Sequence, residues 1–142
     1  MTRRSARKTT EPATNVERLK RGYEAWGRGD LDTTLQFFHP DIEWRNSGVL
    51  VDIDREYHGH DGVRQFWRDF RRPFEEVRIE VERYIERGDE VLVYGRFRAR
   101  GRDGIEVVMT TANVYTFRDG LVVQHESNIT DPERWLEEFE KG

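Results

Sequence analysis

The amino-acid sequence predicts a single α+β domain in which helices pack on one face of a curved antiparallel sheet. Two helical segments come first, a strand and a third helix follow, and a run of alternating strands leads into a last helix. Helices that precede a long antiparallel meander are typical of α+β domains. We therefore expect a cavity between the helices and the sheet.

The composition limits the class of protein. The chain has 142 residues, about one domain, with 35% hydrophobic and 37% charged residues, so the core must rely on aromatic side chains. The absence of Cys excludes disulfides and thiolate metal sites and fits a cytoplasmic protein. No apolar run is long enough for a membrane span or a secretory signal, so we expect no membrane partner.

Charge divides the chain into an arm, 1–13, and a domain, 14–142. Residues 1–15 carry four basic side chains and one acidic one, a charge of +3 that leaves −7 for the rest of a chain of net charge −4. Lacking apolar periodicity, the arm is expected to be disordered. It could contact nucleic acid, but the acidic domain favours a solubilising tail and no nucleic-acid partner.

The first two predicted helices begin at cap residues. Thr14 and Glu17 have capping-box spacing, and Asp30 follows Gly27 and Gly29 as the cap of a short second helix that His39-Pro40 closes. The inward stripe of the first helix is formed by Val16, Leu19, Tyr23 and Trp26, and that of the second by Leu31, Leu35 and Phe38.

A short strand over 42–46 and a polar connection over 47–57 precede a third helix, which begins at Asp61-Gly62 and ends at Pro73. Residues 77–82 and 91–100 then alternate as strands. A last helix follows a predicted capping box, Thr130-Asp131-Pro132-Glu133, and brings Trp135, Leu136 and Phe139 onto the domain.

The segment 107–130 reads as a hairpin around Asp119-Gly120, a dipeptide that accepts positive φ. One face of it is mostly apolar with a few hydrogen-bonding groups, as expected of a pocket wall. That face comprises Met109, Thr111, Asn113, Tyr115, Val123, His125, Ser127 and Ile129.

Three segments, GDLDTTLQFFHPDIEW at 29–44, YHGHDGVRQFW at 57–67 and VYTFRDGLVVQHE at 114–126, resemble the SnoaL-like branch of the nuclear transport factor 2-like superfamily. The resemblance covers residues 14 to about 139. It implies a cone-shaped curved sheet wrapped around three to four helices, an apolar pocket, and a homodimer formed through the outer sheet face. It does not imply one reaction, since this fold holds enzymes and non-enzymes.

Known chemistries of the resembled superfamily fit this chain poorly. The base of ketosteroid isomerases falls at Asn46, their protonated Asp falls at Asn113, and their tyrosine donor falls at Gly22. The catalytic Arg and first Asp of limonene-type epoxide hydrolases fall near Phe97 and Ala99, and the last strand offers Ser127. In SnoaL-like aldol cyclases an Asp acts without a metal or cofactor.

His125 is the main candidate acid/base, because imidazole titrates near neutral pH, and Asn113 could donate to a ligand carbonyl. The alternatives are a polar group that lines a binding cavity and a buried amide. The residues predicted to line the pocket are Tyr23, Trp26, Trp44, Asn46, His58, Trp67, Met109, Thr111, Tyr115 and Ser127, although the aromatic ones could equally be core.

No metal site is predicted, since His58 and His60 lack a third ligand of suitable geometry, although His58 could close one end of the pocket. Arg96, Arg98 and Arg100 are expected on the outer face, paired with Glu residues. We expect a protein that binds a small hydrophobic carbonyl compound without cofactor and could isomerise, cyclise or dehydrate it. The alternative is a non-catalytic binding protein or a dimeric scaffold.

Overall fold

The computed structural model describes residues 13–46 and 53–142. The predicted arm therefore lies, apart from residue 13, outside the described residues, as do residues 47–52 of the connection over 47–57.

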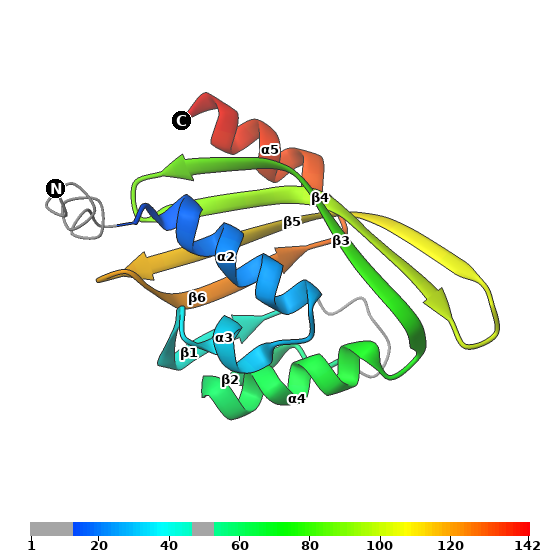
Figure 1. The fold of residues 1–142 in the computed structure, drawn as a ribbon. Coiled ribbons are helices and arrows are strands. Elements are labelled where there is room, and N and C mark those ends of the chain that lie inside the picture. Colours follow the sequence, from blue (N-terminus) through cyan, green and yellow to red (C-terminus); the bar gives the residue numbers. More distant parts are fainter. Residues whose placement is uncertain (1–12, 47–52) are drawn as a thin grey trace, which may run out of the picture.

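A curled, open sheet of six strands forms the body of the fold (Figure 1), in the order β2-β1-β6-β5-β4-β3. All neighbouring strands are antiparallel except β1 and β6, which are parallel, so the prediction of a wholly antiparallel sheet was wrong at this pair. The strands are β1 (Phe38–Arg45), β2 (Glu56–His58), β3 (Phe74–Arg87), β4 (Glu90–Gly101), β5 (Glu106–Arg118) and β6 (Leu121–Asn128).

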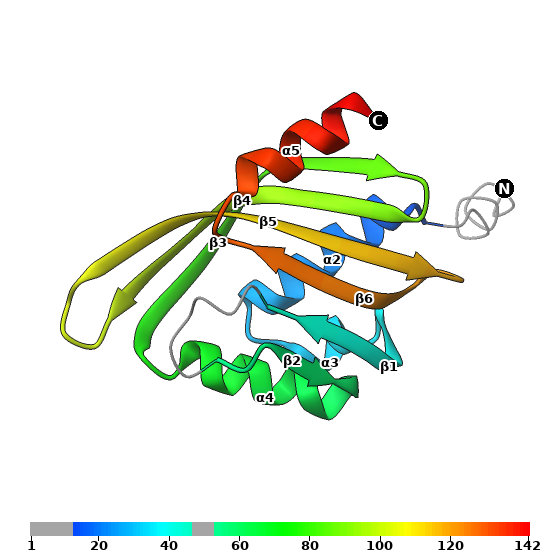
Figure 2. The same cartoon turned by 180° about the vertical axis from the view of Figure 1, so that it is seen from behind.

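Helices cover both faces of the sheet, not one as predicted. Three of them pack toward the concave face around the larger core, and α5 packs on the opposite face, as Figures 1 and 2 show from the two sides. On that face Phe139 is buried against Leu92 and Ala112. The helices are α2 (Asn15–Gly27), α3 (Leu31–Leu35), α4 (Gly59–Arg71) and α5 (Pro132–Lys141). None of the described helices is long and apolar enough to cross a membrane.

The predicted caps of the first two helices are confirmed. Thr14 Oγ1 accepts from the Glu17 amide at 3.1 Å, and the Glu17 carboxylate accepts from the Thr14 amide at 2.9 Å. Asp30 accepts from the Thr33 amide at 3.2 Å. These caps satisfy amides that have no partner within their helix, and thereby fix where α2 and α3 begin.

Three predicted boundaries were wrong. His39 and Pro40 lie within β1 and do not close a helix, because the backbone extends from Phe38 and pairs with β6. The helix α4 begins at Gly59, with His58 in place of Asp61 at its N-cap. At α5 the Thr130 capping box does not form, since Asn128 Oδ1 accepts from the amides of residues 130 and 131 instead.

The meander is confirmed, with a β3 strand longer than the predicted 77–82. On the outer face Arg96, Arg98 and Arg100 pair with Glu82, Glu80 and Glu75 of β3 at 3.4, 2.8 and 3.3 Å, as expected of a solvated ladder. A homodimer through this face stays a prediction. The helix α5 covers part of the same face.

Candidate functional site

A cavity lies between the concave face of the sheet and the helices α2, α3 and α4. Its empty volume is about 900 Å³, part of which opens to solvent. Of the described residues that line it, Arg18 alone carries a formal charge at neutral pH, and no Asp or Glu is among them. Arg18 donates to Asn15 Oδ1 at 2.7 Å. The cavity is therefore apolar and suited to an uncharged molecular body.

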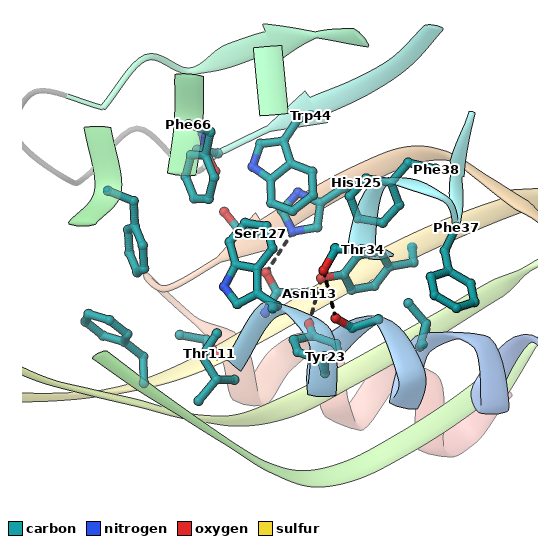
Figure 3. Close-up of a pocket in the computed structure, with 18 of the residues that line it drawn as sticks. Tyr23, Thr34, Phe37, Phe38, Trp44, Phe66, Thr111, Asn113, His125 and Ser127 are labelled. Atoms are coloured by element: carbon teal, nitrogen blue, oxygen red, sulfur yellow. Dashed lines mark hydrogen bonds between the residues drawn. The ribbon is translucent and has the colours of Figure 1, made fainter. Parts of the chain in front are cut away.

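The hairpin of β5 and β6 forms much of the polar part of the wall (Figure 3). Both residues of its turn have positive φ, 53° at Asp119 and 81° at Gly120, which confirms the predicted turn. Cross-strand pairing then sets Asn113 opposite Ser127 and Tyr115 opposite His125. These partners face the cavity because residues two apart share a face of a strand.

One member of the predicted wall is displaced by a register shift. Thr116 pairs with Gln124, but Phe117 pairs with Val122, so one residue of β6 is left over between the two pairs. Val122 is consequently fully buried, and Val123 does not line the cavity. The prediction for Val123 was wrong, because a bulge reverses the alternation of faces.

His125 is held by an amide. Its Nε2 lies 3.0 Å from Asn113 Oδ1, and since an amide oxygen only accepts, the imidazole in this arrangement carries its proton on Nε2. Nδ1 is buried and has no hydrogen-bond partner in the described part of the chain. Burial, with 2% of the residue exposed, lowers the pKa of His125 to about 3. The imidazole is therefore neutral at physiological pH.

Aromatic rings enclose this imidazole. Trp44 stacks on it with ring centroids 3.7 Å apart and planes at 20°, and Trp26 lies beyond Trp44 at 6.0 Å. The indole Nε1 atoms of both tryptophans are buried without a partner among the described residues. Buried donors without acceptors are uncommon, and at a cavity wall they are compatible with an acceptor supplied by water or a ligand.

Two tyrosines form a second polar group. The hydroxyls of Tyr23 and Tyr115 are 2.6 Å apart, so that one donates to the other and a single O–H remains for a further acceptor. Burial raises the pKa of both, and Tyr115 raises that of Tyr23 further. Both phenols are therefore protonated at neutral pH, and the pair can donate one hydrogen bond to a ligand oxygen.

Most predicted site residues meet at this cavity. Lining it are Tyr23, Trp26, Trp44, Asn46, Met109, Thr111, Asn113, Tyr115, His125 and Ser127. His58 and Trp67 do not line it: His58 is exposed, and Trp67 packs against the edge of Trp26 at 4.3 Å. Asn46 also donates to the Asp54 carbonyl at 3.0 Å, which anchors its side chain to the backbone just before β2.

Several lining residues were not predicted from the sequence. Phe70 and Phe97 line the cavity, and so does Thr34, whose hydroxyl lies 3.2 Å from the Gly22 carbonyl. The described residues contain no group of three or more His, Asp or Glu side chains that could hold a metal. His60 is occupied by a contact with the Phe38 carbonyl at 2.9 Å.

Several solved structures are similar to this chain in fold. A protein of unknown function with nuclear transport factor 2-like fold, from Burkholderia pseudomallei K96243, is 25% identical, with 90% of this chain and 98% of that chain covered and a TM-score of 0.78. TerC co-crystallised with polyporic acid is 22% identical over 90% and 98%, with a TM-score of 0.77. A protein described as a SnoaL-like polyketide cyclase, from Jannaschia sp. CCS1, is 19% identical over 83% and 90%, with a TM-score of 0.70.

The curated proteins searched contain no match to the chain. The family model of the SnoaL-like domain matches residues 19–125, a range that includes most of α2, most of the residues that line the cavity, and His125. The structural neighbours agree with this match in fold, with a curled sheet closed by helices. The chain therefore belongs to the SnoaL-like domain family, within the nuclear transport factor 2-like fold.

Proposed function

We propose that this protein binds, in its cavity, a small molecule with an apolar body and a carbonyl or hydroxyl oxygen. The observation that carries the proposal is a cavity with apolar walls, open in part to solvent, on which the Tyr23–Tyr115 pair keeps one O–H donor for a further acceptor. Such a pocket binds by burial of apolar surface and selects by a few hydrogen bonds. TerC, similar in fold, was co-crystallised with polyporic acid, which agrees with a ligand-binding role for the fold.

Calorimetric titration with 2-decanone tests this proposal. Thr111 lines the cavity from β5, and its neighbour Thr110 is on the opposite face of the same strand. Thr111→Phe should therefore reduce binding at least about tenfold, a loss of about 1.4 kcal/mol, whereas Thr110→Phe should leave it unchanged. Native mass spectrometry of the purified protein would show whether a ligand is retained. An empty protein that binds no 2-decanone would contradict the proposal.

Acid/base catalysis by His125 is the second candidate, favoured by its place on the cavity wall beside Asn113 and by a protein of similar fold that is described as a SnoaL-like polyketide cyclase. The geometry supports binding better. The protonated Nε2 donates to Asn113, and the unprotonated ring nitrogen, Nδ1, is buried. A pKa of about 3 also makes the imidazole a weak base.

Proton exchange at carbon distinguishes the two candidates. We expect 2-decanone in D₂O to exchange its α-protons no faster with the protein than with buffer, because His125 is too weak a base at neutral pH. Exchange that is catalysed by the wild type and abolished in His125→Gln would establish the catalytic role instead.

A further inference from the structure

A groove rich in arginine lies where α4 ends, β3 begins and β4 turns into β5. Five guanidinium groups and a single carboxylate line it. The lining residues are Arg68, Arg71, Arg72, Arg100 and Arg102, with Phe74 and Glu75. The chain as a whole has a net charge of −4, so this concentration of positive charge is local.

Two of the five arginines have carboxylate partners. Arg72 contacts Asp69 at 3.2 Å, and Arg100 contacts Glu75 at 3.3 Å and Glu76 at 3.8 Å. These pairs hold part of the groove near neutrality and position two guanidiniums on its wall.

The other three have no carboxylate within 4.0 Å in the described part of the chain. Arg68 donates to the Gln65 side chain at 2.9 Å, Arg102 donates to the Arg72 carbonyl at 3.1 Å, and Arg71 lies over the Trp67 ring at 4.6 Å. Neutral contacts of this kind orient a guanidinium without neutralising it. Each of the three retains donors for an oxyanion.

Phe74 lies between this groove and the cavity. Its ring is 5.6 Å from the Phe97 ring and 6.2 Å from the Phe70 ring, and both of those rings line the cavity. One aromatic side chain therefore forms part of the groove wall on one side and packs on the cavity lining on the other. A single ligand that passes along Phe74 would contact both regions.

We propose that the ligand of the cavity carries an oxyanion, a carboxylate or a phosphate, and that Arg68, Arg71 and Arg102 bind it while the apolar body occupies the cavity. This inference rests on the proposed function and specifies its ligand class as an anionic amphiphile. Guanidinium groups bind both oxyanions through paired N–H donors, so either fits this site.

The test compares three ligands that share one alkyl chain: decanoate, decyl phosphate and 1-decanol. Calorimetric titration at low salt should show the wild type binding at least one of the anions about tenfold or more tightly than 1-decanol, as expected for charge-assisted hydrogen bonds. Which anion binds more tightly distinguishes the carboxylate from the phosphate. Added salt should weaken anion binding and leave 1-decanol binding unchanged.

Charge-matched variants locate the effect. Arg68→Gln combined with Arg71→Gln should bring the anions to the affinity of 1-decanol without changing that of 1-decanol. Arg83→Gln combined with Arg134→Gln removes the same charge from residues outside the groove and should change nothing. Arg102→Gln, which leaves the Trp67 contact intact, repeats the test should the first variant fold poorly.

The outcomes separate the two proposals. If 1-decanol and the anions bind alike, or if both double variants weaken anion binding equally, the arginine site is overturned and the cavity proposal stands. If none of the three ligands binds the wild type, the proposed function itself is overturned and the arginine site with it. Selective loss of anion binding in the groove variants supports both.

Discussion

The two faces of the β4–β5 hairpin differ in the charge and exposure of their side chains. On the concave face Val93, Phe97 and Tyr115 are each no more than 5% exposed. On the convex face, beyond the area that α5 covers, Arg96 and Arg98 keep 49% and 43% of their side chains in water and pair with glutamates.

This difference follows from alternation along the strands, since neighbouring residues point to opposite sides of the sheet. On the concave side an ionisable group must become neutral, as His125 does. On the convex side charges stay hydrated, and each pair contributes little. The concave face therefore carries the site and most of the buried core, whereas the part of the convex face that α5 leaves uncovered tolerates change.

Neighbouring substitutions in β1 give the largest contrast. Trp44 is 4% exposed and packs on Trp26, Phe66 and His125, whereas the Arg45 side chain is 45% exposed. Trp44→Ala should lower the free energy of unfolding by about 3–5 kcal/mol, through lost burial and the cavity left behind. Arg45→Ala should cost less than about 1 kcal/mol. Urea unfolding measures both, and similar costs would remove the distinction between the faces.

The pH dependence of stability tests the neutral imidazole. Because the pKa of His125 is about 3 when folded and about 6.5 when unfolded, the unfolded chain binds the extra proton between these values. Stability is then fully present above pH 6.5 and falls as the pH drops. Between pH 7 and 5 the wild type should lose about 2 kcal/mol that His125→Gln does not lose.

His58→Gln is the matched control for this pH dependence, because His58 is exposed and lies away from the cavity. It should retain the full loss of the wild type. An NMR titration that finds His125 protonating near pH 6.5 would contradict the buried, neutral state.

The sequence predicts those features of the fold that depend on local pattern. The turn at Asp119-Gly120 and the caps at Thr14 and Asp30 are confirmed because each depends on residues within a few positions of one another. The pocket face of β5 is confirmed by its alternation, since Met109, Thr111, Asn113 and Tyr115 all line the cavity.

Features that depend on distant pairing could not be predicted. The bulge that turns Val123 away arises from the register between β5 and β6, and the parallel contact of β1 with β6 joins segments about eighty residues apart. Likewise, the burial of His125 depends on Trp44 from another strand. The sequence could name His125 as a candidate, but its lowered pKa, and hence the preference for binding over catalysis, required the packed structure.

The tyrosine pair allows a test within the concave face. Tyr23→Phe should cost about 1–2 kcal/mol, because the Tyr115 hydroxyl, 2.6 Å away, loses its partner. Tyr115→Phe should cost a similar amount, and the double variant should cost less than the sum, since neither hydroxyl is then left alone. Strictly additive costs, measured by urea unfolding, would show that the two hydroxyls are not coupled.

The smallest effect is expected when two single variants and their double variant are compared in the same way on the convex face. Arg96 Nε lies 3.4 Å from the Glu82 carboxylate, with 49% and 44% of the two side chains exposed. Arg96→Ala, Glu82→Ala and the double variant should give a coupling below about 1 kcal/mol, because water screens the pair and ordering two long side chains opposes it. The coupling should vanish at high salt, whereas that of the tyrosines should persist. A salt-resistant coupling at Arg96 would mean that this part of the convex face is shielded from water in solution, as a subunit interface would be.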